Sequence, residues 1–217
     1  MALTGPHLPP ASGTVKRMVM FLHGYGANGD DLLPIGHEWA GGLPDTVFVS
    51  PHAPEVCEQS SFGYQWFSIR AIDKASFERE KQIEKVTPIL SAHIDAELLR
   101  WGVAEENLAV VGFSQGAMMA MYTMPRRKTP CAGVIGYSGM LIDPQGLIGQ
   151  GIVKPPVLAV HGDRDEVVPP FYLEGVQQGF ETAGFDVETV LRPGLGHGID
   201  GEGLALGLAF LRRVFRI

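Results

Sequence analysis

A serine between two glycines is the first feature of this chain that could do chemistry. The letters GFSQG at 112–116 follow an apolar run and precede AMMAM at 117–121. A serine at a sharp turn between a strand and a helix projects its hydroxyl above the sheet, and flanking glycines remove Cβ atoms that would clash there. The pattern predicts that Ser114 is a nucleophile. The alternative is a tight turn that happens to contain a serine.

A nucleophilic serine needs a base and an acid that orients the base, and both types of residue follow in the chain. The letters HGDRDEVVP at 161–169 place Asp163 and Asp165 after another apolar run, and GLGHGI at 194–199 places His197 in a glycine-lined loop. Where the nucleophile sits on such a turn, the chain order is Ser, Asp or Glu, His. His197 alone could be a surface histidine, but three placements in this order favour a Ser-His-Asp arrangement.

A second glycine motif, GYGANG at 24–29, points to a different function. It is a literal G-x-G-x-x-G between an apolar run and an expected helix, the pattern that binds dinucleotides. That function also needs an acidic residue about twenty positions on, at the end of the second strand, to hold a ribose hydroxyl. No acid follows the motif's neighbouring apolar run at 46–50 before Glu55. Dinucleotide binding therefore stays only as an alternative.

The chain alternates between short apolar runs and helical patterns. The apolar runs lie at 17–23, 46–50, 107–113, 132–138, 156–162 and 186–192. They are nearly continuous in apolar character, which is typical of strands covered on both faces. Apolar residues spaced by three or four predict a helix over 76–101, and further helices are expected after Gly29, Ser114, Pro170 and Gly201. The alternation predicts an α/β fold, a mainly parallel doubly wound sheet flanked by helices, in one domain covering 1–217.

The segment 51–75 differs from the rest of the chain. It is too irregular for a helix and long for a connection, which favours a functional loop containing a small hairpin. Its aromatic residues and the one beside Ser114 are candidates for a substrate pocket: Trp66 first, then Phe67, Tyr64 and Phe113. The methionines Met118, Met119 and Met121 are expected to belong to the core instead.

Composition excludes several classes of function. With 45% apolar and 19% charged residues, the chain has the composition of a globular protein. The formal net charge of −7 and only two short basic runs, at 126–128 and 212–213, argue against nucleic-acid binding. These runs are expected to be solvated faces.

Two cysteines, Cys57 and Cys131, cannot build a disulfide framework, and no metal-ligand spacing is present. No stretch reaches 18 uninterrupted apolar residues, and the first residues lack an apolar signal-peptide core. The expectation is a protein of the cytoplasm with no integral membrane association, no metal and no organic cofactor.

The sequence resembles a known family, the small carboxylesterases and lysophospholipases of the α/β-hydrolase fold, which include the acyl-protein thioesterases. Four segments carry the resemblance: LHGYGANGDDLLP, GFSQGA, HGDRDEVVP and GLGHGI. The loop that ends in Gln65-Trp66-Phe67 looks like the family's tryptophan-bearing loop. The resemblance implies an α/β-hydrolase without a large cap domain. An open cleft would follow, suited to small or monoacyl substrates.

The resemblance also implies a role for each site residue. Ser114 would be the nucleophile, His197 the base and Asp165 the orienting acid, preferred to Asp163 because the family's acid stands just ahead of Val-Val-Pro. The backbone N–H groups of Tyr25 and Gln115 would form the oxyanion hole. His23 would then be structural. Glu166 stands where the family often has proline, and Gly198 where it often has serine, two departures that blur substrate preference more than reaction type.

The expected function is a serine hydrolase that cleaves carboxylic esters or thioesters of short to medium acyl chains through an acyl-enzyme. Lysophospholipase or acyl-protein thioesterase activity at the same site is an alternative within this class. A non-catalytic binding module and a dinucleotide-binding protein are the alternatives outside it. The partner would be a small-molecule ester or thioester, and relatives suggest a homodimer.

Overall fold

A computed structural model describes the chain at residues 3–69 and 76–217, with side chains from residue 80 in the helix that begins at Ser76. In this part of the chain, strands form one seven-stranded sheet in the order β1-β3-β2-β6-β7-β8-β9. β1 runs antiparallel to β3, and every other neighbouring pair is parallel. The strands are β1 (His7–Leu8), β2 (Arg17–Leu22), β3 (Thr46–Val49), β6 (Leu108–Phe113), β7 (Gly133–Tyr137), β8 (Val157–Gly162) and β9 (Val187–Arg192). The mainly parallel sheet is confirmed, and each expected apolar run forms a strand.

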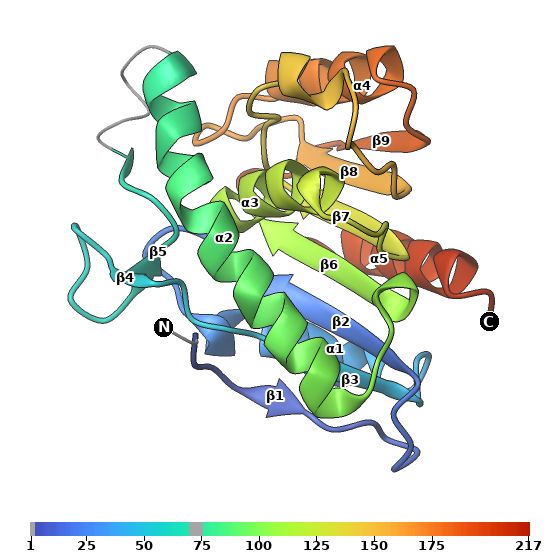
Figure 1. Cartoon of the computed structure of the whole chain (residues 1–217). Helices are drawn as coiled ribbons and strands as arrows, with labels where there is room; N and C mark the ends of the chain where they lie inside the picture. The colour runs from blue at the N-terminus through green and yellow to red at the C-terminus, as the bar shows by residue number, and fades with distance from the viewer. Residues whose placement is uncertain (1–2, 70–75) are drawn as a thin grey trace.

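Helices cover both faces of the sheet (Figure 1). In β2, Met18 and Met20 belong to a buried cluster that contains residues of three helices on one face, whereas Val19 and Phe21 belong to a cluster with residues of two helices on the other. The first group is α2 (Ser76–Trp101), α3 (Gln115–Thr123) and α4 (Phe171–Thr182), and the second is α1 (Leu33–Trp39) and α5 (Gly201–Val214). This is the doubly wound arrangement expected from the alternation, with no large cap over the sheet in the described residues.

The long helix α2 owes its place to its apolar stripe. Residues spaced by three or four along it are all buried against the sheet and α3: Ile83, Val86, Leu90, Ile94 and Leu98. Burial of such a stripe, rather than helix propensity, is what stabilises most helices in proteins. The helix predicted over 76–101 is therefore confirmed at both ends.

The helix expected after Gly29 is confirmed: a 3-10 turn, Gly29–Asp31, capped by the Asn28 side chain, leads into the seven-residue α1. One expectation about the strands was wrong in part. The strand β9 is half-exposed rather than covered on both faces, because it pairs only with β8 and forms the edge of the sheet. The short strand β1 was not predicted, because no apolar run marks it in the sequence.

The segment 51–75 contains the small hairpin that was expected. β4 (Glu55–Val56) pairs antiparallel with β5 (Tyr64–Gln65). Gly63 lies so close to the loop after β2 that a Cβ at this position would be 1.8 Å from the carbonyl oxygen of Gly26. The hairpin is therefore anchored on that loop. Residues 70–75 of the segment lie outside the described residues.

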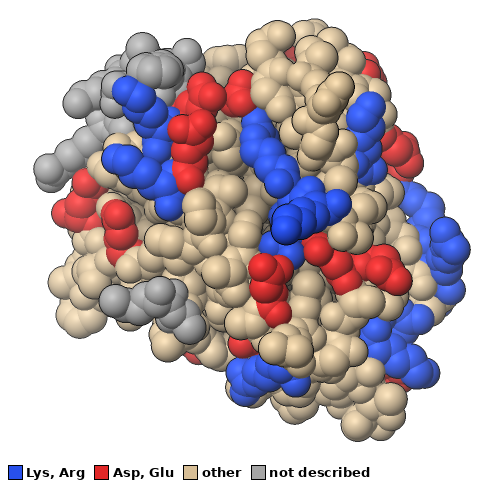
Figure 2. Space-filling view, in the orientation of Figure 1, with Lys and Arg blue, Asp and Glu red and all other residues tan. Residues whose placement is uncertain are grey.

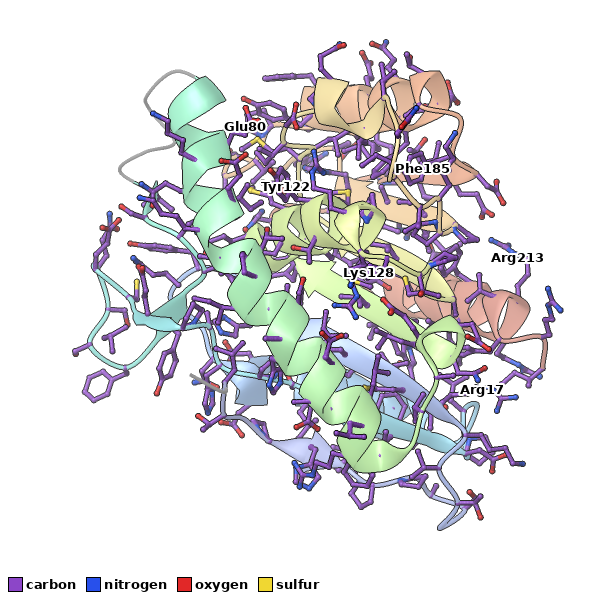
Figure 3. All side chains as sticks on the ribbon, in the orientation of Figure 1. Arg17, Glu80, Tyr122, Lys128, Phe185 and Arg213 are labelled. Atoms are coloured by element: carbon purple, nitrogen blue, oxygen red, sulfur yellow. The ribbon has the colours of Figure 1, made fainter. Side chains whose placement is uncertain are left out.

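Charged side chains of both signs are interspersed on the face seen in Figure 2. Arg126 pairs with Asp143 at 2.7 Å, and Arg127 lies between Asp95 and Glu105. Arg213, from the other basic run, pairs with Glu188. Figure 3 shows Lys128 and Arg213 well apart, on separate elements. The two basic runs therefore do not merge into one patch.

Candidate active site

Ser114 occupies the junction between β6 and α3 at the carboxyl edge of the sheet. Its φ is 54°, a positive value that non-glycine residues seldom adopt and that indicates local strain. A Cβ on Gly112 would lie 2.3 Å from the carbonyl oxygen of Gly116, and one on Gly116 would lie 1.9 Å from that of Leu22. The turn is therefore as tight as the motif predicts, and it requires glycine on both sides of the serine.

His197 connects Ser114 to Asp165 through two hydrogen bonds. Its Nε2 lies 3.0 Å from Ser114 Oγ, and its Nδ1 lies 2.7 Å from Asp165 Oδ2. A carboxylate can only accept, so the proton resides on Nδ1 and Nε2 is free to accept from the serine hydroxyl. Asp165 follows β8, and His197 lies in the loop between β9 and α5. The fold thus brings together three residues from three separate segments.

Asp163, the other acid after β8, points elsewhere. It is exposed, and its Oδ1 accepts a hydrogen bond from the Gly194 backbone N–H at 2.6 Å. This contact ties the loop after β8 to the loop that carries His197. Glu166 is likewise exposed. Of the acids in HGDRDEVVP, Asp165 is the one in contact with the imidazole.

The environment of Asp165 favours its ionised form. Burial raises the pKa of this carboxyl, but the hydrogen bond from His197 and those from the Val168 and Val167 N–H groups outweigh it. The two N–H groups donate to Oδ1 at 2.8 and 2.9 Å. The pKa of Asp165 therefore lies below its ordinary value. The negative charge is held next to the imidazole.

His161 supports Asp165, although the sequence alone did not identify it as a functional residue. Its Nε2 donates to the carbonyl oxygen of Val168 at 2.8 Å and lies 3.3 Å from Asp165 Oδ2. The ring is buried and holds the turn in which Asp165 sits. His161 is the first residue of the HGDRDEVVP motif, so the motif includes it. The spacing of the motif does not indicate that this ring points toward Asp165.

The two residues whose backbone N–H groups are expected to hold an oxyanion both line the cavity beside Ser114. Gln115 is the first residue of α3, so its N–H has no acceptor within the helix. Tyr25 lies in the loop after β2 and lines the same cavity as Ser114. A Cβ on the neighbouring Gly24 would be 3.5 Å from Ser114 Cβ. The loop backbone therefore passes directly beside the serine.

His23 is structural, as expected. Its Nε2 accepts from the Ala53 N–H at 2.9 Å, so its Nδ1 carries the proton and donates to the carbonyl oxygen of Gly24 at 2.7 Å. Burial lowers the pKa of this ring, with the Gly24 contact opposing it. The neutral ring is a fixed support for the loop that carries Tyr25.

A cavity of about 350 Å³ opens beside Ser114 and is lined mainly by apolar side chains. Its walls come from α3, the loops after β7 and β8, the start of α4 and the end of the described part of the 51–75 segment. The residues that face it besides Tyr25, Ser114 and Gln115 are Ile69, Met118, Met140, Val167, Val168, Pro169 and Tyr172. An apolar cavity beside a nucleophile is suited to an acyl chain.

The aromatic residues expected in the pocket are not among those that line this cavity. Trp66 is fully buried and Phe67 nearly so, because both face the core beneath the loop after β2. Phe113 packs its ring 4.9 Å from the His197 ring and lines a separate shallow hollow. Met118 is a buried core residue, as expected, and it also lines the cavity. Met119 and Met121 are core residues as expected.

Nothing in the described residues groups three or more His, Cys, Asp or Glu side chains closely enough to hold a metal ion. Cys57 and Cys131 are both free and buried. Across the same ranges of the chain, none of the helices has the length and apolar character needed to cross a membrane.

Known proteins resemble this chain over almost its whole length. The family model described as Phospholipase/Carboxylesterase matches residues 6–215. Esterase YpfH of Escherichia coli is 26% identical over 197 residues, which cover 91% of this chain and 82% of that protein. Acyl-protein thioesterase 1 of Gibberella zeae is 26% identical over 231 residues, which cover 96% of this chain and 94% of that protein.

Solved structures of other proteins resemble this chain as well. Esterase PE8 is 39% identical with a TM-score of 0.94, and the match covers 99% of this chain and 100% of PE8. SOBER1 of Arabidopsis thaliana shares the fold, with a TM-score of 0.80 and 24% identity. The match covers 92% of this chain and 99% of SOBER1. The chain therefore belongs to the phospholipase/carboxylesterase family of the α/β-hydrolase fold.

Proposed function

We propose that this protein is a serine hydrolase that cleaves carboxylic esters or thioesters of short to medium acyl chains. The observation that carries the proposal is the pair of hydrogen bonds from Ser114 through His197 to Asp165, at 3.0 and 2.7 Å. An imidazole held between a hydroxyl and an ionised carboxylate is set to take the hydroxyl proton. Membership of a family that contains esterases supports the same reaction class.

In the first half of the reaction, Ser114 Oγ attacks the carbonyl carbon of the ester while His197 Nε2 takes the hydroxyl proton. The negative charge that develops on the carbonyl oxygen would be held by the N–H groups of Tyr25 and Gln115. Each such donor is typically worth about 3 kcal/mol of the barrier. The histidine then gives its proton to the leaving alcohol or thiol, and the acyl group remains on Ser114.

In the second half, water attacks the acyl carbon while His197 takes a proton from it, and the imidazolium then returns that proton to Ser114 Oγ as the acyl–Oγ bond breaks and the carboxylic acid leaves. Asp165 keeps the imidazole in the Nδ1–H tautomer and stabilises the imidazolium that forms in each half. A protonated His197 cannot accept the serine proton, so we expect activity to fall on acidification. The scheme uses only groups of the protein, the ester or thioester substrate, and one water molecule.

The substrate class follows from the cavity. At about 350 Å³ it lies near the lower end of the size range of small-molecule sites, and its apolar lining suits a single acyl chain. The absence of a large cap over the described part of the sheet leaves room for varied leaving groups. We therefore favour small or monoacyl substrates. The buried, unpaired cysteines suit the reducing cytoplasm as the place of action.

Hydrolysis of p-nitrophenyl esters from acetate to decanoate tests the proposal, with wild type and Ser114→Ala measured side by side. We expect turnover by wild type and a loss of several orders of magnitude in the variant. If a folded wild type hydrolyses none of these esters, the proposal fails, and a non-catalytic binding module becomes the better description.

Thioesters deserve a separate comparison, because one of the relatives that cover nearly the whole chain is an acyl-protein thioesterase. A matched pair of octanoyl substrates, one oxygen ester and one thioester, would separate the two preferences.

Dinucleotide binding has lost its structural support: GYGANG leads into a 3-10 turn instead of a long helix, and a Cβ on Gly29 would lie 2.0 Å from the Ser50 carbonyl oxygen.

A further inference from the structure

The two backbone N–H groups of the proposed oxyanion hole come from parts of the chain 90 residues apart, and only one of them is on a helix. Gln115 N–H belongs to the first turn of α3, whereas Tyr25 N–H belongs to an irregular loop. An oxyanion is stabilised only by donors about 2.7–3.1 Å from its position, so both must be held to within a fraction of an ångström. Some structure has to hold the loop in register with the helix.

The segment Tyr64–Phe67, called the bridging segment here, contacts both sides. On the loop side, the Gly26 N–H donates to the Tyr64 carbonyl oxygen at 2.9 Å, and the Tyr64 N–H donates to the Ala27 carbonyl oxygen at 2.7 Å. These backbone bonds flank Tyr25 on its carboxyl side. They attach the bridging segment to the loop as a strand attaches to its neighbour.

On the helix side, the contact is made by the side chain of Gln115. Its Oε1 accepts from the Trp66 N–H at 2.8 Å, and its Nε2 donates to the Phe67 carbonyl oxygen at 2.6 Å. The amide is buried, and it is bonded to the bridging segment through both its oxygen and its nitrogen. Buried hydrogen bonds of this kind are strong constraints because breaking one leaves a polar group without a partner.

The indole of Trp66 closes the connection. Its Nε1–H donates to the His23 carbonyl oxygen at 2.9 Å, immediately before the loop that carries Tyr25. The side chain of Trp66 is fully buried, and its ring lies 5.6 Å from the His23 ring. Together with the backbone bonds of Tyr64, this contact fixes the loop on both sides of Tyr25. Gln115, Trp66 and His23 form one continuous chain of hydrogen bonds.

We propose that the side chains of Trp66 and Gln115 are positioning residues for the oxyanion hole, holding the Tyr25 and Gln115 N–H groups at the spacing that the transition state requires. The inference rests on the proposed function of the site. It gives Trp66 a role in catalysis through the indole N–H, with no contact to the acyl chain. It also explains a glutamine side chain at the position after the nucleophile, where the backbone alone makes the proposed contact with substrate.

The test compares Trp66→Phe with Trp39→Phe. Each variant removes one buried indole N–H, because Trp39 Nε1 donates to the Leu204 carbonyl oxygen at 3.2 Å on the other face of the sheet. For Trp66→Phe we expect kcat to fall about tenfold to a hundredfold with KM changed less than about twofold, because oxyanion contacts strengthen in the transition state. Trp39→Phe should leave kcat and KM near their wild-type values.

Two further readouts separate positioning from general loosening. Phenylboronic acid, whose serine adduct resembles the tetrahedral intermediate, should bind Trp66→Phe more weakly by a factor similar to the loss in kcat. The pH profile of kcat should keep its wild-type position, since the base and the acid are untouched. A second variant, Gln115→Met, should show the same pattern, and the double variant should lose less than the product of the two single losses.

The inference is overturned if Trp66→Phe, with a melting transition like that of Trp39→Phe, retains the same kcat as that control. A rise in KM alone, or a shifted pH profile, would also overturn it. Its failure is distinct from that of the proposed function. If wild type hydrolyses esters and Ser114→Ala does not, the site stands whatever Trp66→Phe shows; if wild type is inactive, both fail.

Discussion

At the scale of single residues, hydrogen-bond partners decide what each histidine does. His197 is partly accessible, and its Nε2 faces the Ser114 hydroxyl. His23 is buried, and both of its ring nitrogens are bonded to backbone groups. His161 is also buried, and its Nε2 donates to the Val168 carbonyl oxygen. Three histidines near one site therefore differ in their partners: His197 is the proposed base, His161 supports the acid, and His23 supports the loop after β2.

The buried His23 predicts a stability that depends on pH. Burial lowers its pKa below the ordinary value of about 6.5, so the unfolded chain binds a proton at a higher pH than the folded chain does. The contribution of the neutral His23 ring to stability is therefore complete above about pH 6.5 and is lost as the pH falls below that value. The loss for this one group can reach about 1.4 kcal/mol per pH unit.

Urea unfolding of wild type and His23→Gln between pH 5 and 8 measures this effect. We expect the free energy of unfolding of wild type to fall more steeply below pH 6.5 than that of the variant. His93, whose pKa is also lowered by burial, is present in both proteins and cancels in the comparison. Equal slopes would show that His23 does not account for the acid sensitivity.

The chemistry-bearing residues could be predicted from sequence because their order and glycine neighbours are local signals. Ser114, Asp165 and His197 each stand at a strand end, where a parallel sheet places its site. The role of Trp66 could not be predicted in this way. Whether an aromatic in a long loop turns toward the substrate or beneath the loop depends on its partner, here the His23 carbonyl oxygen, which lies 43 residues away.

At the scale of elements, the junction of β6, α3 and β2 decides the geometry. The first turn of α3 packs directly on the backbone at the end of β2, so a Cβ on Gly116 would lie 1.9 Å from the Leu22 carbonyl oxygen. The close approach brings the start of the helix next to the loop that carries Tyr25. Glycine at this position is a requirement of packing between elements and has nothing to do with helix propensity.

This requirement predicts opposite effects for two helical glycines. Gly116→Ala should lower the free energy of unfolding by at least about 1–3 kcal/mol, because a methyl group cannot fit against backbone. Gly175→Ala in α4, where a Cβ meets nothing within 4 Å, should raise it by up to about 1 kcal/mol through helix propensity. Chemical denaturation of the two variants measures both. A tolerated Gly116→Ala would contradict the close packing described here.

The elements that sequence could predict are those with a continuous or periodic apolar pattern. The six runs form strands, and the apolar stripe of α2 predicted the presence of that helix. The two-residue strand β1 could not be predicted, because it is defined by pairing with β3 and has no pattern of its own. The half-exposed β9 differs from expectation for a related reason: an edge position is a property of the whole sheet.

At the scale of the whole molecule, the cavity beside Ser114 exists because several segments converge at the carboxyl edge of the sheet. Met118 comes from α3, Met140 from the loop after β7, and Tyr172 from the start of α4. No single segment predicts this lining: Met118 is a core residue, as expected, but its place at the cavity depends on the other segments. Under the proposed function, the way the helices pack on the sheet would set the chain length of the preferred acyl group.

Filling the cavity should change that preference. Met140→Trp adds volume to one wall, and we expect the optimum of kcat/KM among p-nitrophenyl esters to shift toward shorter chains. Decanoate should lose far more than acetate, which serves as the internal control because it leaves most of the cavity empty. An equal loss for all chain lengths would show that this cavity does not hold the acyl group.

The central claim is that Ser114 is a nucleophile activated by His197. Mass spectrometry after reaction with a fluorophosphonate probe tests it most directly, because the probe forms a covalent bond with an activated serine. We expect one adduct per chain on the peptide containing Ser114, no adduct in Ser114→Ala and greatly slowed labelling in His197→Ala. Absence of labelling in folded wild type, or an adduct at another residue, would contradict the claim.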